Sequence, residues 1–432
     1  MYAPHIETMP VNQMQELQLN KLRRMIDYCF TNSPFYHEKL LRAGITSGSQ
    51  IQSLSDIARI PFTTKEELRD HYPDGLLAVP RNRIARIHAS SGTTGKPTVG
   101  YYTRCDLNNW AQLTARVLVL NGVTPEDTLQ ISVGYGLFTG ALGFHQGAEQ
   151  LNCTIVPAST GNTQKQLVVM HDFGVTALMA TPSYAAALSE KISDAPNAAG
   201  FRLKKVLFGA ERCTPTIRRM VESRLHVNTA DNYGLTEFWG PGVAGECEYH
   251  KGMHISEDFF YPEIVSPETG EPLPDGELGE LVFTSLDTEA VPLLRYRTHD
   301  LTRLDHSSCA CGRTTVRMEA PMGRTDDMFV LRGINVFPSQ IECAIAKVPE
   351  LSPHYQITLT RDASFRDTAL LEVELTEAAV DAKEQERILH SLENYLREMI
   401  IVRLNTVLLE PGTLERYVGK ARRVDDRRYD ME

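Results

Sequence analysis

Four things are scarce in this 432-residue chain, and each scarcity excludes a class of protein. No run approaches the roughly 18 consecutive apolar residues of a transmembrane helix. Residues 1–26 carry acids and amides where a secretory signal needs an apolar segment, so we expect a cytoplasmic protein. Eight cysteines are too few for a disulfide scaffold. Basic residues are outnumbered, 44 against 55 acidic ones, and a net charge of −11 argues against nucleic acid as the main partner.

What the chain does contain is the composition of an ordinary folded protein. Apolar residues make up 42% and charged residues 23%, which is close to the average for globular domains. At about 150 residues per domain, this length predicts two or three domains. No repeat or low-complexity stretch interrupts the chain, so its organisation has to be inferred from local patterns.

Short apolar runs alternate with amphipathic stretches between residues 84 and 240, which predicts βαβ units and a mostly parallel sheet. From 241 to 325, proline, glycine and aspartate separate shorter β-rich runs. We therefore expect an α/β protein with a large N-terminal domain, residues 1–325, and a small, mobile α+β domain, residues 326–432, with a ligand cleft between them. In the first domain, strands are expected at 84–88, 98–103, 128–133, 153–157, 175–180 and 204–208, and helices at 12–43, 105–121, 163–173, 182–193 and 214–224.

The most informative stretch is a loop rich in glycine, hydroxyl groups and lysine between two predicted strands. Two glycines allow a left-handed backbone, and consecutive N–H groups can form a nest for an anion. The spacing differs from a Walker A loop, in which Ser or Thr follows the lysine, whereas Pro97 follows it here. A phosphate-binding hairpin loop is favoured over a flexible turn. Its residues are Ser90, Ser91, Gly92, Thr93, Thr94, Gly95 and Lys96.

This loop resembles the phosphate loop of the adenylate-forming acyl-CoA synthetases, and four other segments resemble that family in the same order. Wider runs, including residues 135–140 and 333–341, resemble the phenylacetate-CoA ligase branch. The similarity extends over nearly the whole chain, and the ordered motifs together are specific where each alone is weak. The other four motifs are residues 233–237, 296–300, 323–327 with 332–333, and 419–420.

The resemblance implies an AMP-forming acid–thiol ligase that works in two steps. A carboxylate first attacks the α-phosphate of ATP, giving acyl-AMP and pyrophosphate. The thiolate of coenzyme A then attacks the acyl carbonyl and releases AMP. Bringing a carboxylate to a triphosphate requires relief of charge repulsion, which Mg²⁺, a lysine and oriented donors supply.

The resemblance also assigns residues to a nucleotide site in an AMP-binding N-terminal domain, with the glycine-rich loop on the β- and γ-phosphates. Tyr233 offers its ring to adenine, Thr236 bonds the α-phosphate, and Glu237 is a hard oxygen ligand for Mg²⁺. Asp300 accepts hydrogen bonds from the two ribose hydroxyls, and it follows His299, where the family usually has glycine. The remaining nucleotide-site residues are Gly209, Ala210, Glu211, Asn232 and Gly234.

Four further residues are assigned to the end of the chain by the same resemblance. Arg324 reaches ribose or phosphate, and Asp326 is the hinge about which the small domain turns between the two steps. Lys420 is the adenylation lysine, and Gly333 leaves room for the pantetheine thiol in the coenzyme A channel. One departure is modest: Arg416 stands where the family often has threonine, four residues before the lysine.

Aromatic and small residues together form the expected acyl pocket, which suits a flat aryl group. The implied substrate is an aromatic carboxylic acid, and phenylacetate, hydroxyphenylacetate, indoleacetate and benzoate all remain candidates. A single methylene changes binding by only ~1–3 kcal/mol, so the sequence does not separate these acids. The pocket residues are Tyr135, Gly136, Phe138, Thr139 and Gly140.

A separate signal comes from three of the eight cysteines. Cys247 and His250 form one closely spaced pair of metal ligands, and Cys309 and Cys311 form another. Three thiolates and one imidazole suit a closed tetrahedral site, so we expect a structural Zn²⁺ that clamps this part of the fold. His254 is an alternative to His250 that is spaced less well from the first cysteine. Free thiols in loops beside a chance histidine are the less favoured alternative to the zinc site.

Three other functions stay open on the sequence alone. An adenylating enzyme of this kind can pass its acyl group to a carrier protein instead of coenzyme A. A non-catalytic regulator that binds nucleotide and zinc is disfavoured by Glu237 and Lys420, and a zinc-dependent nucleic-acid binder by the acidic charge. The helical N-terminal segment and the habit of the family favour a homodimer.

Overall fold

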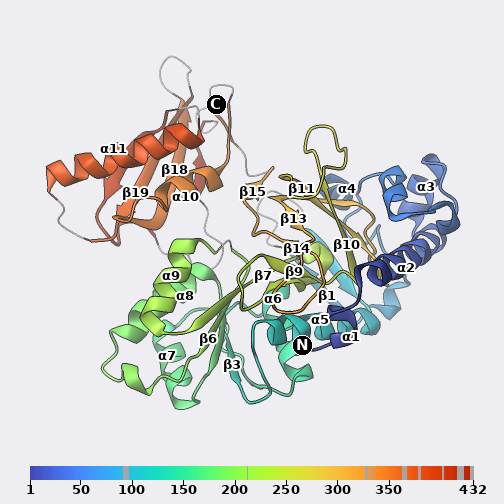
Figure 1. Cartoon of the computed structure of the whole chain (residues 1–432), viewed down its shortest axis with the longest axis horizontal. Coiled ribbons are helices and arrows are strands. Elements are labelled where there is room, and N and C mark those ends of the chain that lie inside the picture. Colours follow the sequence, from blue (N-terminus) through green and yellow to red (C-terminus); the bar gives the residue numbers. More distant parts are fainter. Residues whose placement is uncertain are drawn as a thin grey trace. The chain divides into compact units, whose positions relative to one another are not determined.

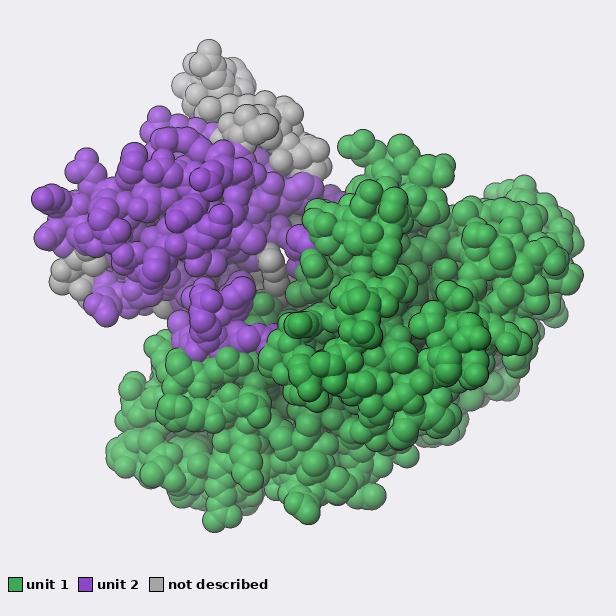
Figure 2. Space-filling model, viewed as in Figure 1, with its two compact units in different colours: residues 1–213, 221–320 green, residues 214–220, 321–432 purple. Residues whose placement is uncertain are grey.

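The computed structural model describes residues 1–90, 97–211, 213–325, 329–331, 334–361, 367–377, 381–400, 403–415 and 423–428. It divides the chain into two compact units, coloured separately in Figure 2. The first comprises residues 1–213 and 221–320, and the second comprises 214–220 and 321–432. The main break, after residue 320, precedes the boundary expected after residue 325. Among the described residues, no helix is both long and apolar enough to cross a membrane.

A sheet with nine strands in the described residues forms the centre of the first unit, in the order β13-β14-β9-β8-β7-β6-β5-β3-β4 (Figure 1). Neighbours are parallel from β4 to β7 and antiparallel from β7 to β13. The parallel half confirms the expected βαβ units. The strands are β3 (Thr128–Ile131), β4 (Thr154–Val156), β5 (Ala177–Ala180), β6 (Lys205–Phe208), β7 (Asn228–Leu235), β8 (Gly240–Glu246), β9 (Met253–Ile255), β13 (Leu304–Asp305) and β14 (Arg317–Met318).

Helices pack against the parallel half, which explains why its strands are continuous apolar runs instead of alternating ones. All four residues of β5 are buried. Ala115 and Phe144, from two of the helices, share a core cluster with Ile131 and Met179 of the sheet. These helices are α5 (Arg104–Leu120), α6 (Thr139–Gln150), α7 (Thr163–Asp172) and α8 (Pro182–Ser193). A further helix, α9 (Pro215–Leu225), is divided between the two units after residue 220.

A second, antiparallel sheet of the first unit contains β10 (Phe260–Val265), β11 (Gly279–Ser285) and β12 (Tyr296–Thr302). Its core is aromatic, with Phe238, Phe260 and Phe283 in mutual ring contact. The β-rich stretch after residue 240 therefore contributes strands to two sheets, and the large sheet continues across that position. The sequence pattern did not indicate this continuation.

Two strands before the large sheet form a separate antiparallel ribbon, β1 (Arg86–Ala89) and β2 (Val99–Tyr102), in which His88 lies opposite Gly100. This confirms the hairpin expected around the glycine-rich loop, whose residues 91–96 lie outside the described part. The helix expected over 12–43 is divided in two, because Pro34 starts a new helix that the Ser33 hydroxyl caps. The helices before the ribbon are α1 (Pro4–Glu7), α2 (Val11–Asn32), α3 (Pro34–Arg42) and α4 (Lys65–Asp70).

The second unit has the expected strand and helix order around its own core. Its sheet runs β20-β19-β18-β21, and Ile388, Leu392 and Leu396 bury one face of its long helix at intervals of four. The α+β class of this unit is thereby confirmed. Its elements are β15 (Gly323–Arg324), β16 (Phe329–Leu331), β17 (Ile334–Val336), α10 (Pro338–Ile345), β18 (Leu351–Arg361), β19 (Asp367–Leu375), α11 (Ala382–Met399), β20 (Asn405–Leu409) and β21 (Val424–Asp426).

Candidate functional site

Two motifs that are far apart in sequence meet in the first unit. β7 carries Tyr233, and a short 3₁₀ turn, Thr236–Phe238, follows it directly. The Tyr233 hydroxyl donates to Oδ2 of Asp300 in β12 at 2.5 Å. The Tyr296 hydroxyl, at the start of the same strand, donates to Oε1 of Glu237 at 3.1 Å. The structure therefore joins the two motifs through two tyrosine–carboxylate hydrogen bonds, and Tyr296 is a member of the group that the sequence reasoning did not single out, although it opens the second motif.

The backbone just before Asp300 explains the glycine that is usual in the family. His299 has φ of +65°, in the left-handed region that glycine adopts freely and other residues adopt at a cost of order 1–3 kcal/mol. Its N–H donates to Oε1 of the buried Glu280 at 3.1 Å. This hydrogen bond holds the strained turn, so the departure from glycine does not displace Asp300.

The segment that follows β6 crosses the carboxyl ends of the parallel strands. Ala210 has φ of +68°, and the Ser183 hydroxyl at the start of α8 donates to Oε2 of Glu211 at 2.6 Å. A Cβ added to Gly209 would lie 2.9 Å from Cε at the flexible end of the Met179 side chain, which could move aside. Ligands of parallel sheets bind at this edge, which agrees with the expected placement of residues 209–211.

Two other expected nucleotide residues are fixed by the sheet itself. Asn232 is buried, and its side-chain amide donates to the Phe208 carbonyl of β6 at 3.1 Å. A Cβ on Gly234 would lie 1.9 Å from the Gly240 carbonyl oxygen, so only glycine permits the turn from β7 toward β8 at this point. Both residues thus hold the end of β7 in place beside Tyr233.

The base of the glycine-rich loop lies beside the same turn. The Ser90 N–H donates to the Thr98 carbonyl, and the Thr98 N–H donates to the Ser90 hydroxyl, both at 2.9 Å, which closes the hairpin. A Cβ on Gly100 would lie 3.3 Å from the Thr236 carbonyl. The described part of the first unit contains a pocket at this junction, lined by Thr98, Gly100, Thr236 and Glu237 with apolar walls from Leu68, Leu77, Val291 and Leu293.

The expected acyl-pocket residues lie at the start of α6 but do not line that pocket. Gly136 and Gly140 face open space, and 52% of the Phe138 side chain is exposed. Thr139 is buried against Gly240, so its side chain is packed in the fold. The Tyr135 hydroxyl lies 3.0 Å from Nδ1 of His145 in the same helix, and burial raises the pKa of this tyrosine to about 12.

The remaining expected residues belong to the second unit or lie outside the described residues. Arg324, in β15, is half-buried within the second unit. The predictions for Ser91, Gly92, Thr93, Thr94, Gly95, Lys96, Asp326, Gly333 and Lys420 fall outside the described residues.

Three cysteines and one histidine form a tight group at the antiparallel end of the large sheet. Their ligand atoms all lie within 4.8 Å of one another. Sγ of Cys247 is 3.7 Å from Sγ of Cys309, and Sγ of Cys311 is 3.4 Å from Nε2 of His254. Zinc–ligand bonds of about 2.3 Å to sulfur and 2.0–2.1 Å to nitrogen give tetrahedron edges of roughly 3.5–3.8 Å, so the spacing fits a Zn²⁺ ion.

The histidine of this group is His254, which corrects the prediction of His250. His250 has φ of +51° in the turn after Cys247, and its Nδ1 is 3.2 Å from a carboxylate oxygen of Glu246. His254 lies in β9, where pairing with β14 fixes its direction, and its Nδ1 is 3.0 Å from the Thr315 hydroxyl. Sequence spacing favoured His250 because it could not show the strand pairing that places His254.

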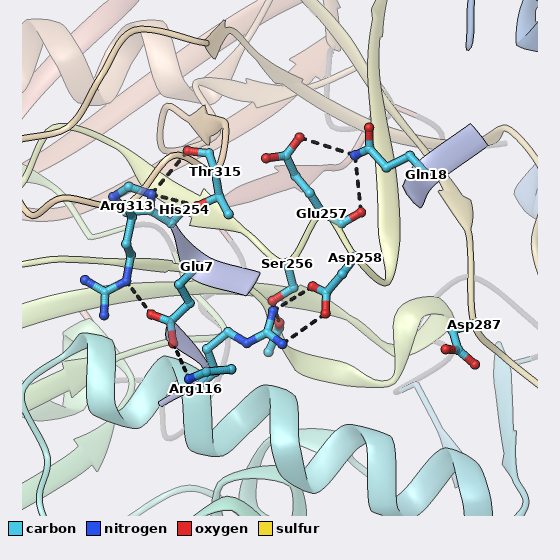
Figure 3. A network of polar contacts seen from close by, with 12 residues as sticks. Glu7, Gln18, Arg116, His254, Ser256, Glu257, Asp258, Asp287, Arg313 and Thr315 are labelled. Carbon is cyan, nitrogen blue, oxygen red and sulfur yellow. Dashed lines mark hydrogen bonds and ion pairs between the residues drawn. The ribbon is translucent and has the colours of Figure 1, made fainter. Parts of the chain in front are cut away.

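Further contacts hold His254 and the loop of the cysteines, and Figure 3 shows those of Thr315 with His254 and of Arg313 with Glu7. Because Nδ1 of His254 contacts Thr315, its Nε2 points toward Cys311. Hydrogen-bond partners on the second ring nitrogen orient metal-binding histidines in this way. Burial, with Arg313 nearby, lowers the pKa of His254 to about 4, so the ring is neutral at pH 7. Arg313 also donates to the buried carboxylate of Glu7 at 2.6 Å and so attaches the N-terminal helix to the cysteine loop.

Comparisons with known proteins fit this arrangement. Residues 38–287 match the AMP-binding enzyme family, and residues 333–428 match the AMP-binding enzyme C-terminal domain. The chain is 45% identical to the phenylacetate-coenzyme A ligase of Thermus thermophilus over 99% of this chain and 100% of that one. This chain belongs to the phenylacetate-CoA ligase family.

Other members of the family and a solved structure agree. The phenylacetate-coenzyme A ligase of Escherichia coli is 44% identical over 98% of this chain and 97% of that one. The crystal structure of 2-hydroxyisobutyryl-CoA ligase with an acyl adenylate, in the postadenylation state, is 29% identical with a TM-score of 0.89, covering 98% of this chain and 91% of that one. The family resemblance, the fold class and the enzyme class expected from the motifs are confirmed.

Proposed function

We propose that this chain is an ATP-dependent ligase that activates an aryl or arylacetic acid as the acyl adenylate and transfers the acyl group to coenzyme A. The observation that carries the proposal is the meeting of Tyr233 with Asp300 and of Tyr296 with Glu237 in a chain related over its full length to phenylacetate-CoA ligases. These contacts gather the ribose-binding and metal-binding carboxylates at one junction beside the base of the phosphate loop.

The described residues have distinct tasks in this reaction. Asp300, oriented by the Tyr233 hydroxyl, accepts from the ribose hydroxyls and fixes the nucleotide. Thr236 donates to the α-phosphate, while the substrate carboxylate attacks the phosphorus and pyrophosphate leaves. Coenzyme A then attacks the acyl carbon through its thiolate, and AMP leaves with the bonding electrons.

Glu237 is the residue that suits Mg²⁺ in this site. It is a half-buried carboxylate beside Thr236 and Thr98, and one of its oxygens is oriented by Tyr296. Mg²⁺ prefers a carboxylate together with phosphate oxygens, and it supplies charge neutralisation when bound. The chain's own contribution is to hold the Glu237 carboxylate in one direction before the nucleotide arrives.

A panel of aryl acids, scored by CoA-dependent release of AMP, tests the function. We expect turnover with at least one arylacetic or benzoic acid and none without coenzyme A. Strict dependence on a carrier protein would replace the CoA reaction by the carrier alternative. No acid-dependent exchange of pyrophosphate into ATP would favour the non-catalytic regulator.

A variant of Lys420 tests whether the chain catalyses adenylation or uses the same fold without catalysis. Lys420→Ala is expected to lower acid-dependent ATP–pyrophosphate exchange by about 10²-fold or more, because a positive charge no longer offsets the repulsion between carboxylate and phosphate. The matched control is Lys347→Ala, on a half-exposed lysine of the second unit. Exchange that survives Lys420→Ala unchanged would contradict the assigned role.

The Cys247–His254–Cys309–Cys311 group supports a structural Zn²⁺ as a further part of the proposal. Three of its four residues are buried, which suits a closed structural site, and none of them lies in the pocket beside Glu237. Metal analysis of the purified protein is expected to give one zinc per chain. The homodimer and the cytoplasmic location stay predictions, and sedimentation equilibrium tests the first of them.

A further inference from the structure

One buried histidine joins the two loops that bracket the reacting groups of the substrates. His88 lies in β1 with 1% of its surface exposed, and its Nδ1 is 3.0 Å from the Leu137 carbonyl. The N–H of Ala89, the next residue, donates to the same carbonyl at 2.9 Å. One oxygen of the segment before α6 is thus held by two successive residues of the strand that leads into the phosphate loop.

The contact fixes the protonation of the ring. A carbonyl oxygen can only accept, so Nδ1 carries the hydrogen and Nε2 is left with a lone pair. Burial, with the Arg86 guanidinium nearby, lowers the pKa of His88 and keeps the ring neutral. Nε2 is buried and has no hydrogen-bond partner among the described residues.

The surroundings of the ring are aromatic and rigid. Tyr102 and Trp110 are stacked with centroids 5.2 Å apart, and each meets His88 edge to face, at 5.3 and 5.7 Å. A phenyl ring would fill this box without an unsatisfied nitrogen, whose burial costs roughly 1–3 kcal/mol. Packing alone therefore favours phenylalanine at position 88. What histidine provides and phenylalanine does not is the hydrogen bond to the Leu137 carbonyl.

On the roles assigned under the proposed function, the two residues in this contact belong to segments that bind different substrates: His88 leads to the phosphate loop, which binds ATP, and Leu137 lies in the acid-binding segment. Ser90, two residues after His88, starts the phosphate loop. Phe138, directly after Leu137, belongs to the expected acyl segment. Reacting atoms must be held about 3–3.5 Å apart for attack, and a misplacement of 1 Å can cost about 10²-fold in rate.

We propose that His88 is a positioning residue for adenylation, which fixes the acyl-binding segment 135–140 against the strand of the phosphate loop through the Nδ1–Leu137 hydrogen bond. The proposal rests on the proposed function. It adds a specific residue whose side chain touches neither substrate but sets the distance between the two loops that hold them.

Three variants separate positioning from packing. His88→Asn keeps an N–H donor at the position of Nδ1, because both nitrogens are two bonds from Cβ, but it leaves space in the aromatic box. His88→Gln moves the donor one bond further out. His88→Phe fills the box and removes the donor. Acid-dependent ATP–pyrophosphate exchange gives kcat and KM for the acid and for ATP, and thermal unfolding gives Tm.

If His88 acts by positioning, the variants should rank in one order for activity and in the opposite order for Tm. His88→Phe and His88→Gln are expected to lower kcat/KM for the acid by about tenfold to a hundredfold, with KM for ATP within about twofold of wild type. His88→Asn is expected to stay within about fivefold in activity although its Tm is lower than that of His88→Phe. Activity that follows Tm instead, with His88→Phe equal to wild type or better than His88→Asn, would overturn the proposal.

Hydrogen exchange separates failure of this proposal from failure of the proposed function. The backbone amides of residues 135–140 are expected to exchange at least several-fold faster in His88→Phe than in wild type or His88→Asn, whether or not any acid is turned over. If the wild-type protein had no ligase activity, the proposed function would be wrong, but the exchange rates would still test the contact between His88 and Leu137. Unchanged exchange in His88→Phe would refute the contact's role directly.

Discussion

The two polar groups of the first unit are built in opposite ways. Around Glu237, one carboxylate lies within β12 and the other in the turn after β7, and Thr236 and Glu237 line a pocket. Around Cys247, donor atoms from three separate segments face one another, and Cys247 and His254 are only 1% and 4% exposed. On the roles proposed above, the pocket of this open group, beside Thr236 and Glu237, receives the nucleotide, whereas the spacing of the closed group around Cys247 suits a single ion. Thr236 and Glu237 are therefore accessible from the pocket, while Asp300 is 6% exposed and as buried as the cysteine group.

The groups also differ in how their members are held. Each carboxylate of the open group is oriented by one tyrosine hydroxyl, from a strand of the other sheet. The closed group is surrounded by the Thr315 contact to His254 and by the Arg313–Glu7 ion pair, which reaches the first helix of the chain. Disturbing the open group should therefore change activity with little effect on stability, and disturbing the closed group should do the reverse.

The largest expected effect comes from the carboxylate in the pocket. Glu237→Gln is expected to lower acid-dependent ATP–pyrophosphate exchange by about 10²- to 10³-fold, because the neutral amide no longer holds Mg²⁺ or balances its charge. The Tm should stay within about 2 °C of wild type, since the amide oxygen still accepts from Tyr296. Glu248→Gln, on an exposed glutamate outside both groups, is the control. Exchange within fivefold of wild type would contradict the expected role of Glu237 in adenylation.

The next effect tests the closed group with a matched pair of histidines. His254→Ala is expected to lose the bound zinc and to lower Tm by about 5 °C or more, where 1 kcal/mol corresponds to roughly 2–4 °C. His250→Ala should retain zinc and lie within about 1 °C of wild type, because it removes a partly exposed ion pair with Glu246. Chelation should lower Tm in wild type and His250→Ala but not in His254→Ala. The reverse pattern would show that the zinc ligand is His250, the histidine favoured by sequence spacing.

The difference between these groups also shows what the sequence could predict. The alternation of apolar runs located β3, β5 and β6 to within a few residues, because buried parallel strands are continuous apolar segments. The family motifs singled out Tyr233, Glu237 and Asp300, and the structure brings the segments that carry them together through two hydrogen bonds.

What the sequence could not predict depends on strand pairing. The large sheet continues from β7 into β8 through Gly234, which local patterns cannot show. The same limit caused the choice of His250, because only the pairing of β9 with β14 turns His254 toward the cysteines. The contact between His88 and Leu137 could likewise not be predicted, although Leu137 lies in the run 135–140, since it joins a strand to a loop 49 residues away.

A smaller effect is expected from the tyrosine that orients the ribose carboxylate. Tyr233→Phe keeps the ring for adenine but removes the hydrogen bond to Asp300, and a bond to a charged group is worth about 1.5–3 kcal/mol. We expect KM for ATP to rise about tenfold, with kcat changed less than threefold. Tyr261→Phe, in β10 of the same sheet as Asp300, is the control. A lower kcat at unchanged KM would place Tyr233 in the chemical step instead.

The smallest expected effect is the pH response of His88, which has the same direction as that of His254 and is isolated by the variant His88→Phe. Burial, and then Arg86, lowers the pKa of folded His88, so the unfolded chain binds its proton more readily. Its contribution to stability is therefore complete above the unfolded pKa of about 6.5 and declines as pH falls below it, by at most about 1.4 kcal/mol per pH unit. Urea unfolding at pH 7.5 and 5.5 should show a larger loss in wild type than in His88→Phe, whose ring cannot titrate. An equal loss in both proteins would mean that the buried ring accepts a proton as readily as an exposed one, and burial would then not be what keeps Nε2 unprotonated.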